Sequence, residues 1–308
     1  MESPSSSSEQ YRNWLELPRD VTASILQRLG AIEILMSAQH VCMTWYNLCK
    51  EPSMWRTIEM HNLDDLWIMP YDPEKMCRNA VDRSSGQLVD INLEFFVSDD
   101  LLNYIALSSS QLRRVRLVSC NSISDKGLSE AAAKLPLLEE LDLSLCAFTK
   151  ETLEVVGCCC PLLKSLKLNR RGYRRPHLHH DEEVLAVAEN MPELRHLQLF
   201  GNTLTDWGLE AILNGCPHLE SLDLRRCFNV DLSGNLERRC EGIKNLWLPY
   251  DAADDYELDP ESDIGSVDYH YTMDYDDFTV YHEYDESSGH SDSPRHGYIY
   301  DGEELIFF

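Results

Sequence analysis

The chain lacks the features that would place it in a membrane, on nucleic acid or in an oxidising compartment. No apolar run approaches the roughly eighteen residues that a membrane-spanning helix requires. Only 27 basic residues stand against 53 acidic ones, without a long basic stripe, so nucleic-acid binding is disfavoured. We find no signal-peptide pattern in the first ten residues and no Asn-x-Ser/Thr acceptor, and the 11 cysteines are an odd number. These absences predict a reducing compartment, the nucleus or the cytoplasm.

Acidic charge is abundant, but it is unevenly placed. Residues 251–308 carry 18 acidic residues against one Arg, together with eight Tyr and few aliphatic residues. A segment of this composition buries too little apolar surface to fold alone, so we expect an acidic, tyrosine-rich, disordered tail. The interleaved aromatics, Tyr256 among them, leave a second interpretation open, in which the tail docks on a partner or on the basic loop at residues 170–175.

One pattern recurs through the middle of the chain: an apolar residue followed by others three and five positions later. Consecutive copies start 24 to 31 residues apart. They are Leu88-Ile91-Leu93, Leu112-Val115-Leu117, Leu138-Leu141-Leu143, Leu163-Leu166-Leu168, Leu194-Leu197-Leu199, Leu219-Leu222-Leu224 and a truncated Ile243-Leu246-Leu248. This is the leucine-rich-repeat signature, in which each unit contributes a strand and a return helix. We therefore expect an α/β solenoid over residues 88–250, with about six to seven repeats and a curved parallel sheet.

Cysteines follow several of the repeat strands. Cys120, Cys146 and Cys227 stand at the turn after a strand, where a small and readily buried side chain fits. A catalytic thiol would instead need a histidine base and an activating environment. Their recurrence by repeat position indicates packing residues, and no catalytic residue is assigned.

The one long repeat contains an insertion at residues 170–180, which is rich in Arg and His. Insertions in solenoids map to loops, often on the binding face. The loop could contact a phosphate or an acidic partner, or it could be a solvated loop neutralised by its own acidic end and by the tail. Its histidines, His177, His179 and His180, lack a fixed spacing or a Cys partner, so no metal site is predicted.

A different segment precedes the repeats, and its pattern is helical. Val21, Ile25, Leu26 and Leu29 form one apolar stripe that ends at Gly30, and two further short helices fit up to residue 49. We expect a small helical domain over residues 13–60, after a disordered stretch at 1–12 and before a connector at 61–87. Such a block is marginal as a free-standing core, so the solenoid or a partner should cover part of it.

The motifs in this block resemble an F-box. They are Leu17-Pro18-x-Asp20, Ile25-Leu26-x-Arg28-Leu29, Val41-Cys42-x-x-Trp45 and Pro52-Ser53-x-Trp55-Arg56. Followed by leucine-rich repeats, they make residues 13 to 250 similar to a plant-type F-box/leucine-rich-repeat protein. The resemblance implies that the block binds a Skp-type linker and through it a cullin. By the same resemblance the linker-binding residues are Leu17, Pro18, Ile25, Leu26, Leu29, Val41, Cys42 and Trp45.

The strand positions that flank the inward leucines should project from the concave face of the sheet. Those we expect to bind a target are Arg114, Arg116, Asp142, Lys167, Gln198, Phe200, Asp223, Arg225 and Trp247. Because exposed aromatic and Arg side chains dominate interface energetics, Arg116, Phe200, Arg225 and Trp247 are the expected anchors. A solvated polar face without a ligand is the alternative.

The resemblance implies a non-catalytic adaptor of an SCF-type ubiquitin ligase, in which the F-box holds the linker and the repeats hold a protein target for ubiquitination and degradation. No cofactor is expected. Two alternatives stay open. The chain could be a repeat scaffold or inhibitor that recruits no ligase, or a thiol or metal enzyme that uses the Cys-rich segment, Cys158-Cys159-Cys160, or the His loop at residues 177–180.

Overall fold

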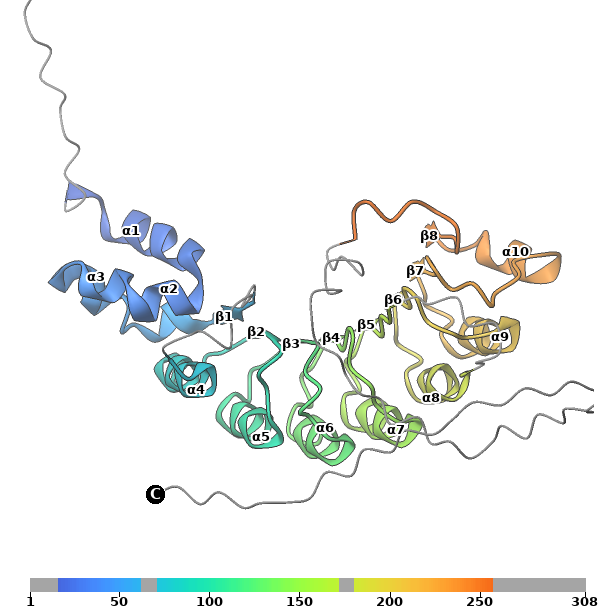
Figure 1. The fold of residues 1–308 in the computed structure, drawn as a ribbon, viewed down its shortest axis with the longest axis horizontal. Helices are drawn as coiled ribbons and strands as arrows, with labels where there is room; N and C mark the ends of the chain where they lie inside the picture. Colours follow the sequence, from blue (N-terminus) through green and yellow to red (C-terminus); the bar gives the residue numbers. More distant parts are fainter. Residues whose placement is uncertain (1–15, 62–70, 172–179, 257–308) are drawn as a thin grey trace, which may run out of the picture. The chain divides into compact units, whose positions relative to one another are not determined.

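The computed structural model describes residues 16–61, 71–171 and 180–256 (Figure 1). Within these residues, eight parallel strands form one sheet in chain order from β1 to β8. Helices connect successive strands and lie along one face of the sheet (Figure 1). The predicted α/β solenoid with a parallel sheet is thus confirmed. The disordered stretch expected at 1–12 and residues 257–308 of the expected disordered tail lie outside the described residues, whereas residues 251–256 of that tail are described.

The strands are short, three to five residues each, and their registers match the repeat pattern. The strands are β1 (Thr57–Met60), β2 (Asp90–Glu94), β3 (Arg114–Val118), β4 (Glu140–Asp142), β5 (Ser165–Lys167), β6 (His196–Gln198), β7 (Ser221–Asp223) and β8 (Asn245–Trp247). The connecting helices are α4 (Pro73–Ser84), α5 (Asp99–Ser108), α6 (Asp125–Ala132), α7 (Lys150–Cys159), α8 (Glu182–Asn190), α9 (Asp206–Gly215) and α10 (Asn235–Cys240).

The amino-terminal block contains the three short helices that its apolar pattern predicts. They are α1 (Arg19–Leu26), α2 (Gly30–Met36) and α3 (Met43–Leu48), with 3₁₀ turns at Gln27–Leu29, Ala38–His40 and Pro52–Trp55. Helix α3 begins where the Cys42 thiol accepts a hydrogen bond from the backbone N–H of Trp45. The Cys-x-x-Trp spacing therefore marks a helix start.

The solenoid begins earlier than the first triplet we recognised. Strand β1 lies at the end of the helical block and pairs with β2, so that Ile58 is opposite Ile91 and Met60 opposite Leu93. Trp55, Ile58 and Met60 have the same spacing as the later triplets. The segment 61–87, which we expected to be only a connector, contains the return helix α4.

The helical block and the repeats share one hydrophobic core. Trp55 is 1% exposed, and its indole N–H donates a hydrogen bond of 2.8 Å to the carbonyl of Cys49. The guanidinium of Arg83, on α4, lies 5.3 Å from the centre of the Trp55 ring. Buried residues of the block and of the first six repeat triplets belong to the same cluster, and the partly buried Ile243 and Leu246 of the last triplet pack against it. Part of the block's apolar surface is thus covered by the solenoid, as its small size requires.

Several strands end in a tight turn, and a buried cysteine follows three of these turns. Phe95, Ser119, Leu145 and Arg226 have positive φ angles between 52° and 71° at equivalent repeat positions. The cysteines that follow these turns are buried, as their repeat position predicts. Cys227 Sγ donates a hydrogen bond of 3.0 Å to the carbonyl of Leu199 in the preceding repeat, and Cys120 and Cys146 make the same type of contact with Leu93 and Leu117.

Candidate functional site

Large apolar side chains remain exposed on the amino-terminal block despite the shared core. Five of them, on and between α1, α2 and α3, form what we call the amino-terminal apolar face: Val21, Leu29, Met36, Val41 and Met43. Val41 and Met43 expose 63% and 71% of their surface. Exposed apolar residues concentrated in one small block are typical of a protein-binding surface.

The structure places the expected linker-binding residues at different depths. Pro18, Leu29 and Val41 are exposed, and Leu17, Ile25, Cys42 and Trp45 are half-buried. Leu26 is fully buried in the core, because it points inward where Val21 and Leu29 of the same stripe point outward. Leu26 can therefore support a binding surface but cannot be part of one.

Val21, Met36 and Met43 belong to the apolar face but were absent from the residues that the resemblance implied. The apolar stripe at positions 21 to 29 contained the signal for Val21. Nothing in the sequence distinguishes Met36 and Met43 from buried neighbours, because exposure depends on how the three helices pack.

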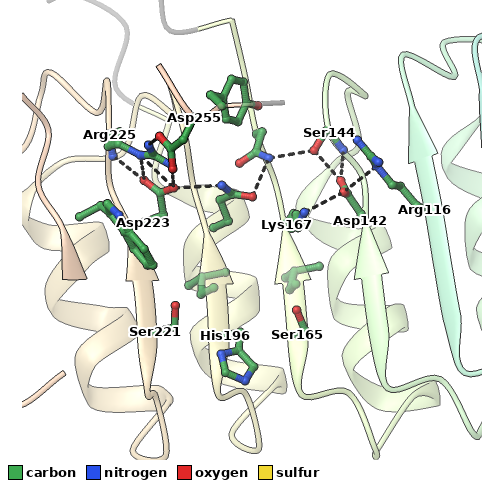
Figure 2. Close-up of a pocket in the computed structure, with 16 residues that line it drawn as sticks. Arg116, Asp142, Ser144, Ser165, Lys167, His196, Ser221, Asp223, Arg225 and Asp255 are labelled. Carbon is green, nitrogen blue, oxygen red and sulfur yellow. Dashed lines mark hydrogen bonds and ion pairs between the residues drawn. The ribbon is translucent and has the colours of Figure 1, made fainter. Parts of the chain in front are cut away.

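A polar groove of about 310 Å³ lies on the repeats, on the face of the sheet opposite the helices (Figure 2). Its walls come from the carboxyl-terminal half of the sheet and from the chain after β8. The lining side chains include Arg116, Asp142, Lys167, His196, Gln198, Asp223, Arg225, Trp247, Asp255 and Tyr256. Three of these from the sheet are cationic and two are carboxylates, which leaves one positive charge in excess.

A chain of polar contacts crosses four strands at the base of the groove (Figure 2). Asn169 donates hydrogen bonds of 2.9 Å to Ser144 Oγ and 3.2 Å to Gln198 Oε1. Gln198 then donates one of 2.9 Å to Asp223. At the other end, Asp142 accepts a hydrogen bond from Ser144 and pairs with Lys167 Nζ at 3.5 Å. The network fixes these side chains before any ligand binds.

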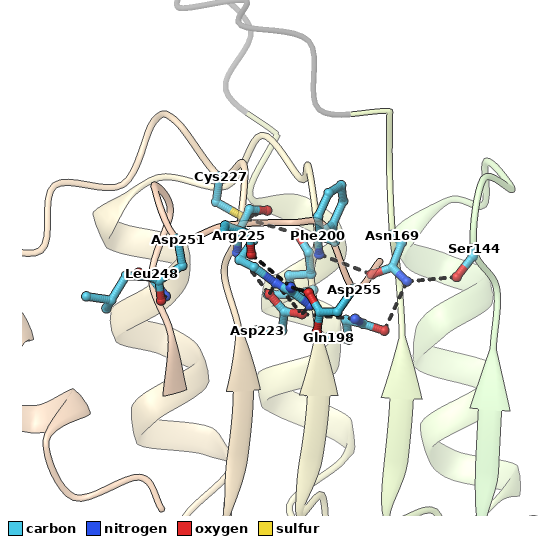
Figure 3. Close-up of polar contacts among 12 residues, drawn as sticks. Ser144, Asn169, Gln198, Phe200, Asp223, Arg225, Cys227, Leu248, Asp251 and Asp255 are labelled. Atoms are coloured by element: carbon cyan, nitrogen blue, oxygen red, sulfur yellow. Dashed lines mark hydrogen bonds and ion pairs between the residues drawn. The ribbon is translucent and has the colours of Figure 1, made fainter. Parts of the chain in front are cut away.

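Arg225 and Asp223 form a buried ion pair beside this chain (Figure 3). Both are 4% exposed, and Arg225 Nη2 lies 2.8 Å from Asp223 Oδ2. The hydrogen bonds with Asp223, and then the one with Asp255, raise the pKa of Arg225. A buried charge pair of this kind needs all its polar partners, so the site depends on both carboxylates.

The structure brings most of the expected target-binding residues together. Arg116, Asp142, Lys167, Gln198, Asp223, Arg225 and Trp247 all line the groove. Arg114 does not; it is exposed nearby and pairs with Asp90 at 2.9 Å. Whether any of them binds a target stays a prediction.

Phe200 departs from the expectation of an exposed anchor, because it is 0% exposed. It follows β6 by two residues, and the ring of Tyr256 stacks on it with centroids 3.7 Å apart. The start of the acidic tail therefore lies on the concave face, although we had considered the basic loop as its docking site. Asp255 and Tyr256 are the residues of this site that the sequence did not identify.

The thiol-enzyme alternative requires a cysteine with a nucleophilic thiolate and a nearby histidine base. In the Cys-rich segment, burial raises the pKa of the Cys160 thiol to about 12, which disfavours its nucleophilic thiolate, whereas Cys158 is exposed and Cys159 is half-buried. His196 lies between Ser165 and Ser221 in the strand register, but no hydrogen bond joins its ring to either hydroxyl in this part of the structure.

No group of three or more His, Cys, Asp or Glu side chains is placed to hold a metal ion within residues 16–61, 71–171 and 180–256. His177 and His179 lie outside these ranges. In the same ranges, no helix has the length and apolar character needed to span a bilayer.

Comparison with known proteins matches both parts of the chain. A family model described as F-box-like matches residues 14–61. A model of the leucine-rich repeats of FBD-associated F-box protein At5g56370 matches residues 76–182, and a leucine-rich-repeat model matches residues 191–213.

Relatives from Arabidopsis thaliana resemble the chain over most of its length. F-box protein SKIP19 is 52% identical over 91% of this chain and 92% of its own. Putative F-box/LRR-repeat protein 22 is 48% identical over 84% of each chain. Among solved structures, the leucine-rich repeat-containing protein LegL7 from Legionella pneumophila is 17% identical with a TM-score of 0.39, over 56% of this chain and 57% of that one.

Proposed function

Because this chain belongs to the family of F-box/leucine-rich-repeat proteins, we propose that it is the substrate-recognition adaptor of an SCF-type ubiquitin ligase. In this role the amino-terminal block binds a Skp-type linker, and through it a cullin. The groove on the repeats binds a protein target that is then ubiquitinated and degraded. The chain supplies no catalytic group or cofactor; it accelerates transfer by raising the effective concentration of the target near the ligase.

The observation that carries this proposal is the separation of two unlike surfaces on one chain. Exposed aliphatic side chains on α1 to α3 suit a stable helical interface, which is built around apolar anchors. The groove offers fixed charges and hydrogen-bonding groups, which suit a polar peptide segment. An adaptor needs two such surfaces that can be occupied at once.

The same proposal places the protein in the nucleus or the cytoplasm. In the described residues all eleven cysteines are free thiols, and most of them are buried. Free thiols of this number persist in a reducing environment.

The test is to add charge to the amino-terminal apolar face. In the double variant V41E/M43E, both substitutions fall on exposed positions, so the fold should be retained. Loss of two apolar anchors should weaken linker binding by at least about 30-fold, which corresponds to about 2 kcal/mol. Co-purification of the linker and the cullin with the full chain measures this.

A matched control is L107E, because Leu107 on α5 is also a large apolar residue and is 66% exposed. It should leave linker binding unchanged. If the wild-type chain captures no linker, or if V41E/M43E captures as much as L107E, the adaptor role is wrong and the scaffold or inhibitor alternative is favoured.

A further inference from the structure

The chain after β8 turns back over the groove. Residues 250–256, which we call the covering segment, run back from β8 toward the earlier strands (Figure 1), and Asp255 and Tyr256 line the groove. Two tight turns direct it there: the Asp251 side chain accepts a hydrogen bond of 2.7 Å from the Leu248 N–H, and the Tyr256 N–H donates one of 3.0 Å to the Ala253 carbonyl. Its path is therefore set by local structure as well as by contacts with the groove.

Asp255 reaches the buried cation of the groove. Arg225 Nη1 donates to the Asp255 carboxylate and, at 3.1 Å, to the carbonyl of Ala252, while the rest of the guanidinium holds Asp223 (Figure 3). The hydrogen bond from Arg225 lowers the pKa of Asp255. The carboxylate thus supplies the negative charge that the sheet residues of the groove lack.

Next to Asp255, the side chain of Tyr256 packs on the ring of Phe200. Its ring is within 3° of parallel to that of Phe200, which it shields from solvent. On the described chain, no group forms a hydrogen bond with its buried hydroxyl oxygen. Stacking and burial account for the contact, so a phenylalanine ring would fit this position as well.

We infer that this end of the groove is a recognition site for a peptide segment in which an acidic residue directly precedes an aromatic one, and that Asp255 and Tyr256 occupy it as an internal ligand. The inference rests on the proposed function, in which the groove binds the target. A target would then carry the same acidic–aromatic pair and would have to displace the covering segment. The chain's own segment consequently weakens the binding of every such target.

The experiment uses the full chain and a labelled heptapeptide with the sequence of residues 250–256. The variant D255K/Y256A removes both contacts and repels Arg225, so the peptide should bind it at least 10-fold more tightly than it binds the wild type. The matched control D254K/Y250A changes the same residue types in the same segment, at two exposed positions outside the groove. It should bind the peptide as the wild type does.

Two further peptides test the chemistry of the site. A peptide with Ala in place of its last two residues should not bind D255K/Y256A, and one that ends in Phe should bind no more weakly than the Tyr form. Circular dichroism checks folding, and Y256A alone gives the same test if the double variant does not fold. Equal binding to wild type and D255K/Y256A, or equal binding of the Ala peptide, overturns the inference.

Linker capture by the same protein preparations separates this inference from the proposed function. Linker capture depends only on the amino-terminal apolar face, whereas peptide binding depends only on the groove. Normal capture with failed peptide tests contradicts the inference alone. Failed capture by the wild type with the expected peptide binding contradicts the adaptor role and leaves the recognition site supported.

Discussion

Single glycines determine how closely the return helices pack. Gly215, at the end of α9, lies against the backbone of Ala188 on α8, and a Cβ at this position would overlap the Ala188 carbonyl. Gly157 on α7 meets Asn190 on α8 in a similar way. Backbone atoms cannot move aside as the end of a flexible side chain can, so the absence of a Cβ is a packing requirement here.

The variant G215A should therefore lose about 1–3 kcal/mol of stability, the usual cost of an added methyl group in a packed interface. Chemical denaturation of the full chain measures it. G242A is the control, because a Cβ on exposed Gly242 would meet only the Arg239 carbonyl at an ordinary 3.6 Å. Equal stability of G215A and wild type would show that α8 and α9 can separate without cost.

At the residue scale, the sequence predicted the burial of the repeat residues better than the exposure of the expected binding residues. Most leucines of the triplets and the turn cysteines are buried as their spacing predicts, but Leu248 of the truncated last triplet is 41% exposed. Phe200 and Leu26 were assigned to surfaces and are buried, because each is covered by a group distant in sequence or by the packing of neighbouring helices. Trp55 could have been recognised as the start of a repeat from its spacing to Ile58 and Met60.

Neighbouring repeats are connected through the starts of their helices. An aspartate at the N-cap or in the first turn of one helix accepts a hydrogen bond from the N-cap residue of the next helix. The pairs are Asp99 with Ser124, Asp125 with Thr149, and Asp181 with Thr205. Each contact satisfies a donor at a helix N-terminus and fixes the spacing of two repeats. The recurring Asp in the repeat sequence thus connects neighbouring repeats.

Removal of one such contact in D125A should cost about 1–2 kcal/mol of stability. Asp125 Oδ1 accepts hydrogen bonds of 2.8 Å from the Thr149 N–H and 2.6 Å from the Thr152 hydroxyl. Burial alone would raise the pKa of Asp125, but these hydrogen bonds lower it below its usual value. D100A, at an exposed aspartate in the first turn of α5, is the control and should cost less.

The lowered pKa also predicts a pH dependence. A carboxylate whose pKa is lower in the folded state stabilises the fold fully above its unfolded pKa of about 3.9, and this contribution is lost as the pH falls through the folded value. The stability difference between wild type and D125A should therefore be constant above about pH 5 and shrink below pH 4. A difference that grows on acidification would contradict this assignment.

At the scale of the whole molecule, helix α4 adds polar contacts to the β1–β2 pairing and the shared core that join the amino-terminal block to the solenoid. Arg83 on this helix stacks on Trp55, donates a hydrogen bond of 3.0 Å to Gln39 Oε1 and contacts the Cys49 carbonyl at 3.4 Å. Arg78 on the same helix instead contacts Tyr104 of α5, within the solenoid. The two arginines therefore face different neighbours.

The variant R83A should loosen the helical block without unfolding the repeats. Loss of about 1 kcal/mol of local stability corresponds to roughly fivefold faster amide exchange, here at α3 and the turn Pro52–Trp55. Hydrogen exchange followed by mass spectrometry resolves these segments, and R78A should leave them unchanged. If R83A and R78A accelerate exchange equally in the block, α4 does not connect it to the repeats through Arg83.

The sequence by itself determined the repeat architecture and the helical block, because periodic burial of Leu and the helix-start motifs are local properties of the chain. Tertiary structure alone decided which side chains stay exposed on that block and that Asp255 and Tyr256 lie in the groove. The physical reason is that Asp255 is 30 residues from Arg225, and Tyr256 is farther still from Phe200. No spacing rule connects such residues; only the path of the folded chain does.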